Sequence, residues 1–229
     1  MEVKGWALSN ESPPEQLTDD GASVSIPYLT WYPKIDCYKL NISSLHFGKK
    51  SRGRFNPNLS VFDPQRQSMD EFLAENTVTR RKITSVVARI PDILGRLAPL
   101  TLRFKHDLRK LIEENSAWDD PVSEKQMLRW KTNFLIIEDV KDIMYFRCHV
   151  PDDAVDLKCR IYVLCYAAKE GIVNGAYSGF LKSDSTWSCN NILGRGLLAP
   201  EEWTITRKEL GALNVASNVK AVVERALGD

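Results

Sequence analysis

The hydrophobic period of the chain changes after Pro151, and this change limits the fold more than any other sequence feature. Over residues 159–166, one set of alternate positions is apolar and the other is mostly aromatic or aliphatic. This pattern is typical of a β-strand whose two faces are both partly covered. Two further strand-like runs follow at residues 172–182 and 186–199. The three runs predict an antiparallel meander.

A helix with a regular apolar stripe follows the meander. Thr206 and Glu209 form the T-x-x-E pattern of a capping box, which predicts the start of this helix. The apolar side chains recur at helical spacing, at Ala212, Val215, Ala216, Val219, Val222, Val223 and Ala226. The expected order over residues 151–229 is therefore strand, strand, strand, helix.

The middle of the chain has helical periodicity instead. Apolar residues at positions i, i+3, i+4 and i+7 within residues 83–90 predict a helix that ends before Pro91. Ser123 and Gln126 form a second capping box at the start of a later helix. We expect residues 69–135 to be rich in helix.

The N-terminal part shows weaker patterns. Aromatic and β-branched residues predict strands at residues 28–32 and 35–47, and an irregular loop that begins with basic residues spans 49–68. The first residues have no periodicity. We therefore expect three parts: a disordered tail over residues 1–27, a domain over 28–150 with a strand pair, basic loop and helices, and a β-β-β-α domain over 151–229.

The composition excludes several classes of protein. Hydrophobic residues make up 43% of the chain and charged residues 27%, with a formal net charge of +1, as in folded globular proteins. No run of about 18 apolar residues is present, and the first residues lack the apolar segment of a secretory signal. We expect an intracellular protein of the cytoplasm or nucleus with no membrane partner.

The cysteines and histidines predict no metal site. The five cysteines are an odd number without a C-x-x-C pair, and His46, His106 and His149 complete no ligand cluster. We expect reduced thiols, mostly buried or half-buried, and neither a metal ion nor another cofactor.

Charge is segregated along the chain although the total is near zero. Residues 79–110 carry nine basic and two acidic residues, whereas residues 111–156 carry five basic and eleven acidic residues. Two interpretations are open: neighbouring helices neutralise each other, or a basic helical face binds RNA or DNA phosphates. The candidate phosphate-binding residues are Arg80, Arg81, Lys82, Arg89, Arg103, Lys105 and Arg109.

Short motifs resemble one known family. Residues 77–105 read TVTRRKITSVVARIPDILGRLAPLTLRFK, tryptophans follow at Trp118 and Trp130, and LAP at 198–200 precedes TITRKEL at 204–210. In this order and spacing they resemble the linker and first ribonuclease H segment of Bel/Pao-type retrotransposon polyproteins. The resemblance implies an α+β fold, in which a helical linker domain packs with a truncated ribonuclease H-like β-β-β-α unit.

The departures from that family predict that the chain is not an enzyme. The family's first strand ends F-x-D-A-S, and its Asp binds the metal ions; the run here is Leu164-Cys165-Tyr166-Ala167-Ala168. A phenol with a pKa of about 10 cannot replace this carboxylate in two-metal hydrolysis. Two further family carboxylates lie beyond the first helix, where this chain has ended, so the resemblance leaves Glu209 alone.

Other acidic residues have simpler explanations. Glu209 is explained by its place in the predicted capping box, with metal binding as the alternative. Asp119-Asp120 is similar to a polymerase palm motif, but the second palm strand and its acid are missing, so a loop role is favoured.

The resemblance implies a host-retained, inactive fragment that acts as an interaction scaffold or adaptor, with an RNA-handling or silencing complex as its setting. The alternatives are nucleic-acid binding without cleavage and, more remotely, residual ribonuclease H activity.

A partner site is expected along the first strand of the meander, because its outer edge would present unpaired main-chain groups. The residues of this edge are Arg160, Ile161, Tyr162, Val163 and Leu164. A protein strand or a second copy of the chain would cover the edge, and residues 143–150 are an internal candidate for the same place.

Overall fold

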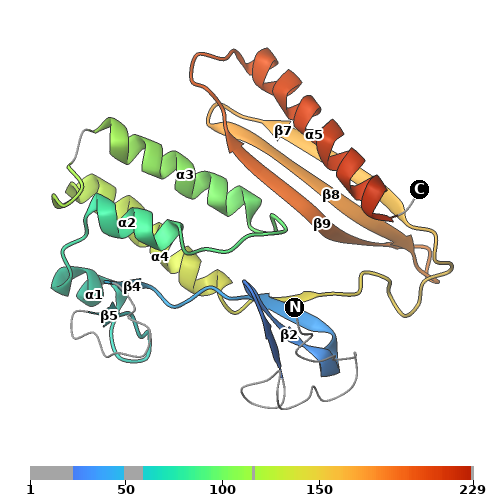
Figure 1. The fold of residues 1–229 in the computed structure, drawn as a ribbon, viewed down its shortest axis with the longest axis horizontal. Coiled ribbons are helices and arrows are strands. Elements are labelled where there is room, and N and C mark those ends of the chain that lie inside the picture. The colour runs from blue at the N-terminus through green and yellow to red at the C-terminus, as the bar shows by residue number, and fades with distance from the viewer. Residues whose placement is uncertain (1–22, 49–58, 115–116, 228–229) are drawn as a thin grey trace, which may run out of the picture. The chain divides into compact units, whose positions relative to one another are not determined.

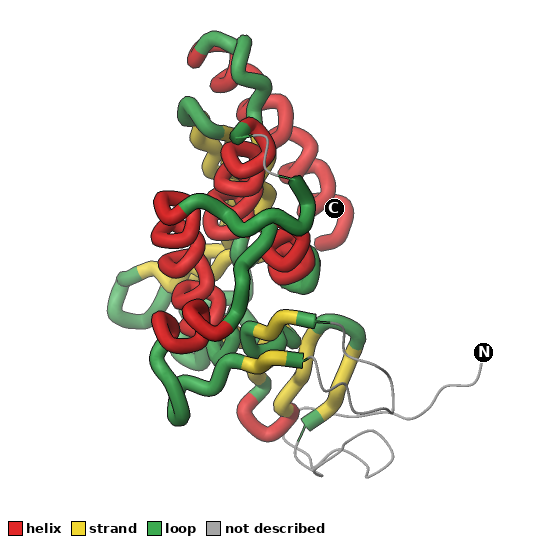
Figure 2. The backbone as a smooth tube through the Cα atoms, turned by 90° about the vertical axis from the view of Figure 1, so that its left-hand side faces the viewer, coloured by secondary structure: helices red, strands yellow, loops and turns green. Residues whose placement is uncertain are grey.

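The computed structural model describes residues 23–48, 59–114 and 117–227. The basic start of the predicted loop and residues 1–22 of the predicted tail lie outside these ranges. Two compact units are formed, one by Met1–Pro91 with Asp107–Tyr145 and the other by Asp92–His106 with Phe146–Asp229. Residues 92–106, which the sequence placed in the first domain, thus make their contacts in the second unit. Figures 1 and 2 show the elements of both.

The first unit contains two small sheets. Strands β1 (Val24–Ile26), β2 (Leu29–Tyr32), β3 (Cys37–Leu40) and β6 (Met144–Phe146) form one sheet, in the order β1-β2-β3-β6. Strands β4 (His46–Phe47) and β5 (Ser60–Val61) form the other.

Three predictions for this region were wrong in detail. The expected strand over residues 35–47 is divided between β3 and β4, which belong to different sheets. Strand β1 lies inside the expected tail, and β5 inside the expected irregular loop. Such short strands carry too few residues for a periodic signal, and they form because a neighbouring strand supplies hydrogen bonds.

The helices of this unit begin at capped positions, of which the sequence predicts the one at Ser123. Helix α1 (Met69–Glu75) has a capping box formed by Ser68 and Glu71, and α2 (Arg80–Val87) is capped by Thr79. The Ser123 side chain accepts a hydrogen bond from the Gln126 N–H at the start of α4 (Glu124–Val140). The expected helix-rich segment is confirmed.

The core of the first unit combines aromatic rings with one buried ionic group. Phe47, Phe72, Trp130 and Phe134 are buried and in ring contact. Asp107 of α3 (Ala98–Glu113) is fully buried. Its carboxylate accepts hydrogen bonds from Arg129 Nε at 2.5 Å and Asn133 Nδ2 at 2.7 Å. These contacts tie α3 to α4 inside this unit.

The second unit has the predicted strand, strand, strand, helix order. Strands β7 (Arg160–Ala167), β8 (Gly171–Leu181) and β9 (Trp187–Leu198) form an antiparallel sheet, and α5 (Ile205–Leu227) covers one face of it (Figure 1). The buried apolar side chains of α5 are Ala212, Ala216, Val219 and Val223. They pack on Ile172 and Ala176 of β8 and on alternate residues of β7. The mixed α+β fold class is confirmed.

No described helix is both long and apolar enough to cross a bilayer.

Candidate interaction site

The two faces of β7 differ strongly in exposure. Ile161, Val163, Cys165 and Ala167 are half-buried and pack toward α5. The intervening side chains point to the other face, where Leu164 is 62% and Tyr166 is 70% exposed. The prediction that both faces are partly covered was wrong, because α5 covers only one of them.

The exposed face of the sheet is aromatic. Tyr162 and Trp187 lie over Gly179, where an added Cβ would come within 2.7 Å of the Tyr162 ring. The Arg160 guanidinium lies 4.5 Å from the centroid of the Trp187 ring. Glycine at position 179 therefore lets rings from the two outer strands approach each other across β8.

The outer edge of β7 has no partner strand among the described residues. β7 is the first strand in the order β7-β8-β9, and its described main-chain bonds run to β8 or close the hairpin. The prediction that residues 143–150 could cover this edge was wrong. The strand within these residues, β6, pairs with β3 in another sheet. From Ile161 to Ala167 the strand contains no charge, proline or bulge, the features that usually protect an exposed edge.

The opposite edge of the same sheet is covered by the chain itself. Gly194 of β9 donates its N–H to Leu94 O at 2.8 Å, and Lys105 Nζ donates to Gly196 O at 3.4 Å. Gly95 has a φ of +65°, and an added Cβ there would lie 1.8 Å from Gly194 O. We call residues 94–105 the covering segment. Its contact with β9 needs glycine on both sides.

The start of α5 differs from the prediction. Thr204 Oγ1 accepts a hydrogen bond from the Arg207 N–H at 3.3 Å, and the helix begins at Ile205. Thr204 is therefore the capping residue, and the predicted capping box of Thr206 and Glu209 is wrong. The exposed Glu209 side chain has no capping role.

The two positions that correspond to ribonuclease H carboxylates are not brought to one face. Tyr166 projects from the exposed face of β7, whereas Glu209 is carried by α5 on the other side of the sheet. Lys208, next to Glu209, is 2% exposed, and its Nζ donates to Lys169 O in the β7–β8 turn at 2.7 Å. The sequence pattern does not indicate this lysine, because its neighbours are polar.

The basic residues at the start of α2 have partners within their own unit. Arg81 donates to both carboxylate oxygens of Asp119, at 2.7 and 2.9 Å, which raises the pKa of Arg81 and lowers that of Asp119. The Arg80 guanidinium lies 4.5 Å from the Trp118 ring centroid, and Lys82 Nζ donates to Thr77 O at 2.7 Å.

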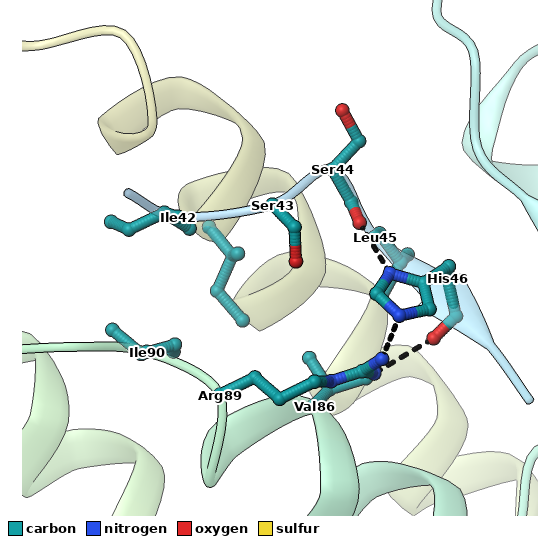
Figure 3. Close-up of a pocket in the computed structure, with 9 residues that line it drawn as sticks. Ile42, Ser43, Ser44, Leu45, His46, Val86, Arg89 and Ile90 are labelled. Atoms are coloured by element: carbon teal, nitrogen blue, oxygen red, sulfur yellow. Dashed lines mark hydrogen bonds between the residues drawn. The ribbon is translucent and has the colours of Figure 1, made fainter. Parts of the chain in front are cut away.

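Arg89 lines a small pocket with the buried His46 (Figure 3). Arg89 Nη2 donates to His46 O at 2.8 Å, and Nη1 contacts His46 Nε2. His46 Nδ1 lies 2.9 Å from Ser44 O, which assigns the ring proton to Nδ1. Burial lowers the pKa of Arg89. This arginine joins α2 to β4.

The remaining candidates are divided between the units. Arg109 lies in the first unit, and Arg103 and Lys105 lie in the second. Nucleic-acid binding by these seven residues stays a prediction.

A shallow cleft of about 370 Å³ opens between the covering segment's start, β9 and α5. Its lining includes Asp92, Arg195 and Asn218 around an apolar floor. The Leu97 N–H lies 3.1 Å from each carboxylate oxygen of Asp92, and burial raises the pKa of this carboxyl.

The cysteines are more exposed than the sequence predicts. Cys148, Cys159 and Cys189 are exposed, Cys165 is half-buried and Cys37 is buried. All five are free thiols, and burial raises the pKa of Cys37 and Cys159. Within the described ranges, no group of three or more His, Cys, Asp or Glu side chains could hold a metal ion.

A comparison with family models identifies the chain's relatives. The model described as Pao retrotransposon-like RNaseH-like domain matches residues 79–228. The chain belongs to this family. The match begins at Thr79, the cap of α2, and includes the β7–β9 sheet with α5. The resemblance to Bel/Pao-type elements is thereby confirmed for this ribonuclease H-like domain. Comparisons with curated proteins and with solved structures give no match.

Proposed function

We propose that this Pao-type ribonuclease H-like chain is a non-enzymatic interaction module, and that its binding site is the outer edge of β7. In this role it acts as a scaffold or adaptor in an RNA-handling or silencing complex of the cytoplasm or nucleus. One observation carries the proposal: in the described chain this apolar strand edge has no partner.

The physical argument is the cost of leaving such an edge in water. Unpaired N–H and C=O groups beside apolar side chains are a template for pairing with any available strand. Addition of a partner strand satisfies these groups, while side-chain pockets on the two sheet faces supply specificity. Tyr162, Leu164 and Tyr166 would contact such a strand on the exposed face.

Two observations support the absence of catalysis. Tyr166 stands where the resemblance places a metal-binding carboxylate, and its phenol ring carries no carboxylate oxygens. Tyr166 and Glu209 also project on opposite sides of the sheet, so they cannot bind the same metal ion. Two-metal hydrolysis requires carboxylates that converge on one centre.

Hydrogen exchange on the purified chain tests the docking edge. We expect the outward-facing amides of Arg160–Ala167 to exchange faster than those paired with β8, because only the latter are hydrogen-bonded. Full protection of both sets in a proven monomer would contradict the proposal.

Capture from a cell extract, with nuclease treatment, tests the class of partner. Leu164→Glu places a charge on the exposed face of β7 and should abolish capture of nuclease-resistant protein partners. The matched control is Leu128→Glu on α4, because Leu128 is similarly exposed, at 68%, in the other unit. Equal capture by both variants argues against the β7 edge.

A further inference from the structure

We infer that the strand that pairs with the outer edge of β7 is β7 of a second copy of this chain, in an antiparallel arrangement about a two-fold axis. This inference rests on the proposed function, because it names the partner of the same edge. Three features of the second unit support it: the side-chain pattern of β7, the position of α5 over the sheet and an exposed leucine on the flank of α5 that faces β7.

The side-chain pattern of β7 is self-complementary. In a two-fold antiparallel pair, equivalent residues at equal distances from the axis lie opposite each other on the same face. With the axis at Val163, Tyr162 lies opposite the partner's Leu164, and Arg160 lies opposite the partner's Tyr166. Arg160 is the one charged residue in the strand, so no like charges meet.

The two α5 helices would also meet. Ala212 of α5 shares a buried cluster with Ile172 of β8 and Ala199, and Cys165 and Ala167 of β7 pack against this cluster. We therefore place the axis of α5 between β7 and β8. Strands are about 4.8 Å apart, which separates the two α5 axes by two strand spacings, or roughly 10 Å. Packed helices lie about 8–10 Å apart, so the axis that pairs the strands also brings the helices into contact.

The flank of α5 that faces this contact carries an exposed leucine. Asn218 and Val222 line the cleft beside β9, so that flank of the helix faces β9. Leu213 lies nine residues before Val222, which is half a turn around the helix axis, so it faces the β7 side. Leu213 is 57% exposed in the single chain. The second α5 would cover it.

The experiment measures the mass of the full-length chain by sedimentation across a concentration series. We expect a dimer, and we expect Leu213→Glu to weaken it by at least about tenfold, because each copy would bury an unpaired carboxylate against the second α5. Val222→Glu is the matched control: Val222 lies on the same helix and is 55% exposed, but on the opposite flank. Melting curves of both variants check that the fold is kept.

The outcomes separate this inference from the proposed function. If the wild type is a monomer at high micromolar concentration, the inference that a second copy pairs with β7 is wrong. If the outward-facing amides of β7 also exchange fast in that monomer, the proposed docking edge is kept, with another protein as its partner. Full protection of β7 in the monomer overturns both. If Val222→Glu weakens the dimer and Leu213→Glu does not, the interface does not include the β7 flank of α5, and the inference is wrong.

Discussion

The two edges of the β7–β9 sheet are treated in opposite ways. At β9, the covering segment forms a main-chain hydrogen bond to Gly194 and packs backbone against backbone through two glycines. At β7, no described residue pairs with the edge, although its side chains are at least as apolar. The comparison shows that one apolar edge of this sheet is closed by main-chain contact, whereas the other has no partner strand among the described residues, and we propose this second edge as the docking site.

The largest expected effect is the loss of stability when Gly95, which contacts Gly194 of β9, is given a side chain. Gly95→Ala places a Cβ on Gly194 O and forces a left-handed φ on a residue with a side chain. We expect a loss of about 3 kcal/mol or more in the free energy of unfolding, measured by denaturant titration. The control is Gly211→Ala in α5, where the nearest contact would be 3.0 Å and helix propensity offsets it. If Gly95→Ala has the same denaturation midpoint as the wild type, the contact between Gly95 and Gly194 is not tight.

The helix α5, which packs on β7, is stabilised by a cap at Thr204 rather than at Thr206. Thr204→Ala should cost about 1 kcal/mol, because the Arg207 N–H loses its acceptor. Thr206→Ala should stay within about 0.5 kcal/mol of the wild type, since the residue is exposed and caps nothing. Thermal melts compare the two variants. A larger loss for Thr206→Ala would restore the capping box expected from sequence.

Acid should lower the free energy of unfolding through His149, which contacts β8 of the sheet. His149 Nδ1 lies 3.1 Å from Ser178 Oγ and its Nε2 lies 3.1 Å from Arg96, and burial, followed by the charge of Arg96, lowers the pKa of His149. The unfolded chain then binds the proton more readily than the folded chain. Stability should fall as the pH drops below about 6.5, the usual histidine value, toward the lowered folded pKa.

Unfolding titrations between pH 7 and pH 5 measure this effect, with His149→Gln as the comparison. The variant should show a flatter dependence of stability on pH. If the wild type and His149→Gln have parallel pH profiles, His149 does not cause this dependence.

The smallest expected effect is an absence of nuclease activity. It concerns the end of β7, where Tyr166 occupies the position of a family carboxylate. Purified chain with Mg²⁺ or Mn²⁺ should leave an RNA–DNA hybrid intact, because Tyr166 supplies no carboxylate and Glu209 lies on the other side of the sheet. Gel analysis of a labelled hybrid measures this. Cleavage above the buffer control that disappears in Glu209→Gln would show that the fold still hydrolyses nucleic acid.

Much of the fold was predictable because the relevant forces act between residues close in sequence. Helix caps at Ser68, Thr79 and Ser123 satisfy N–H groups two or three residues away, so short motifs report them. The period-two run of β7 and the apolar stripe of α5 reflect burial on one side of a regular element. The family resemblance added the ribonuclease H-like fold to which this order of elements belongs.

The candidate site was predicted less completely. The edge residues of β7 were named from the order of the strands, but the exposure of one whole face was not expected. The charge pattern left open that the basic stretch is neutralised by its neighbours, but it did not reveal that Asp119 and Trp118 contact the arginines at the start of α2, or that His46 contacts Arg89 just after this helix. Such pairs join residues about 40 positions apart, and no local period records them.

The sequence by itself determined the helices, the three-strand meander and the replacement of a carboxylate by Tyr166, because each depends on local spacing or residue identity. Only the tertiary structure decided that Thr204 rather than Thr206 caps α5, that β6 joins β3, and that residues 94–105 close β9 while no described strand pairs with the outer edge of β7. The physical reason is that strand pairing and edge coverage depend on which distant segment supplies the matching hydrogen-bond groups.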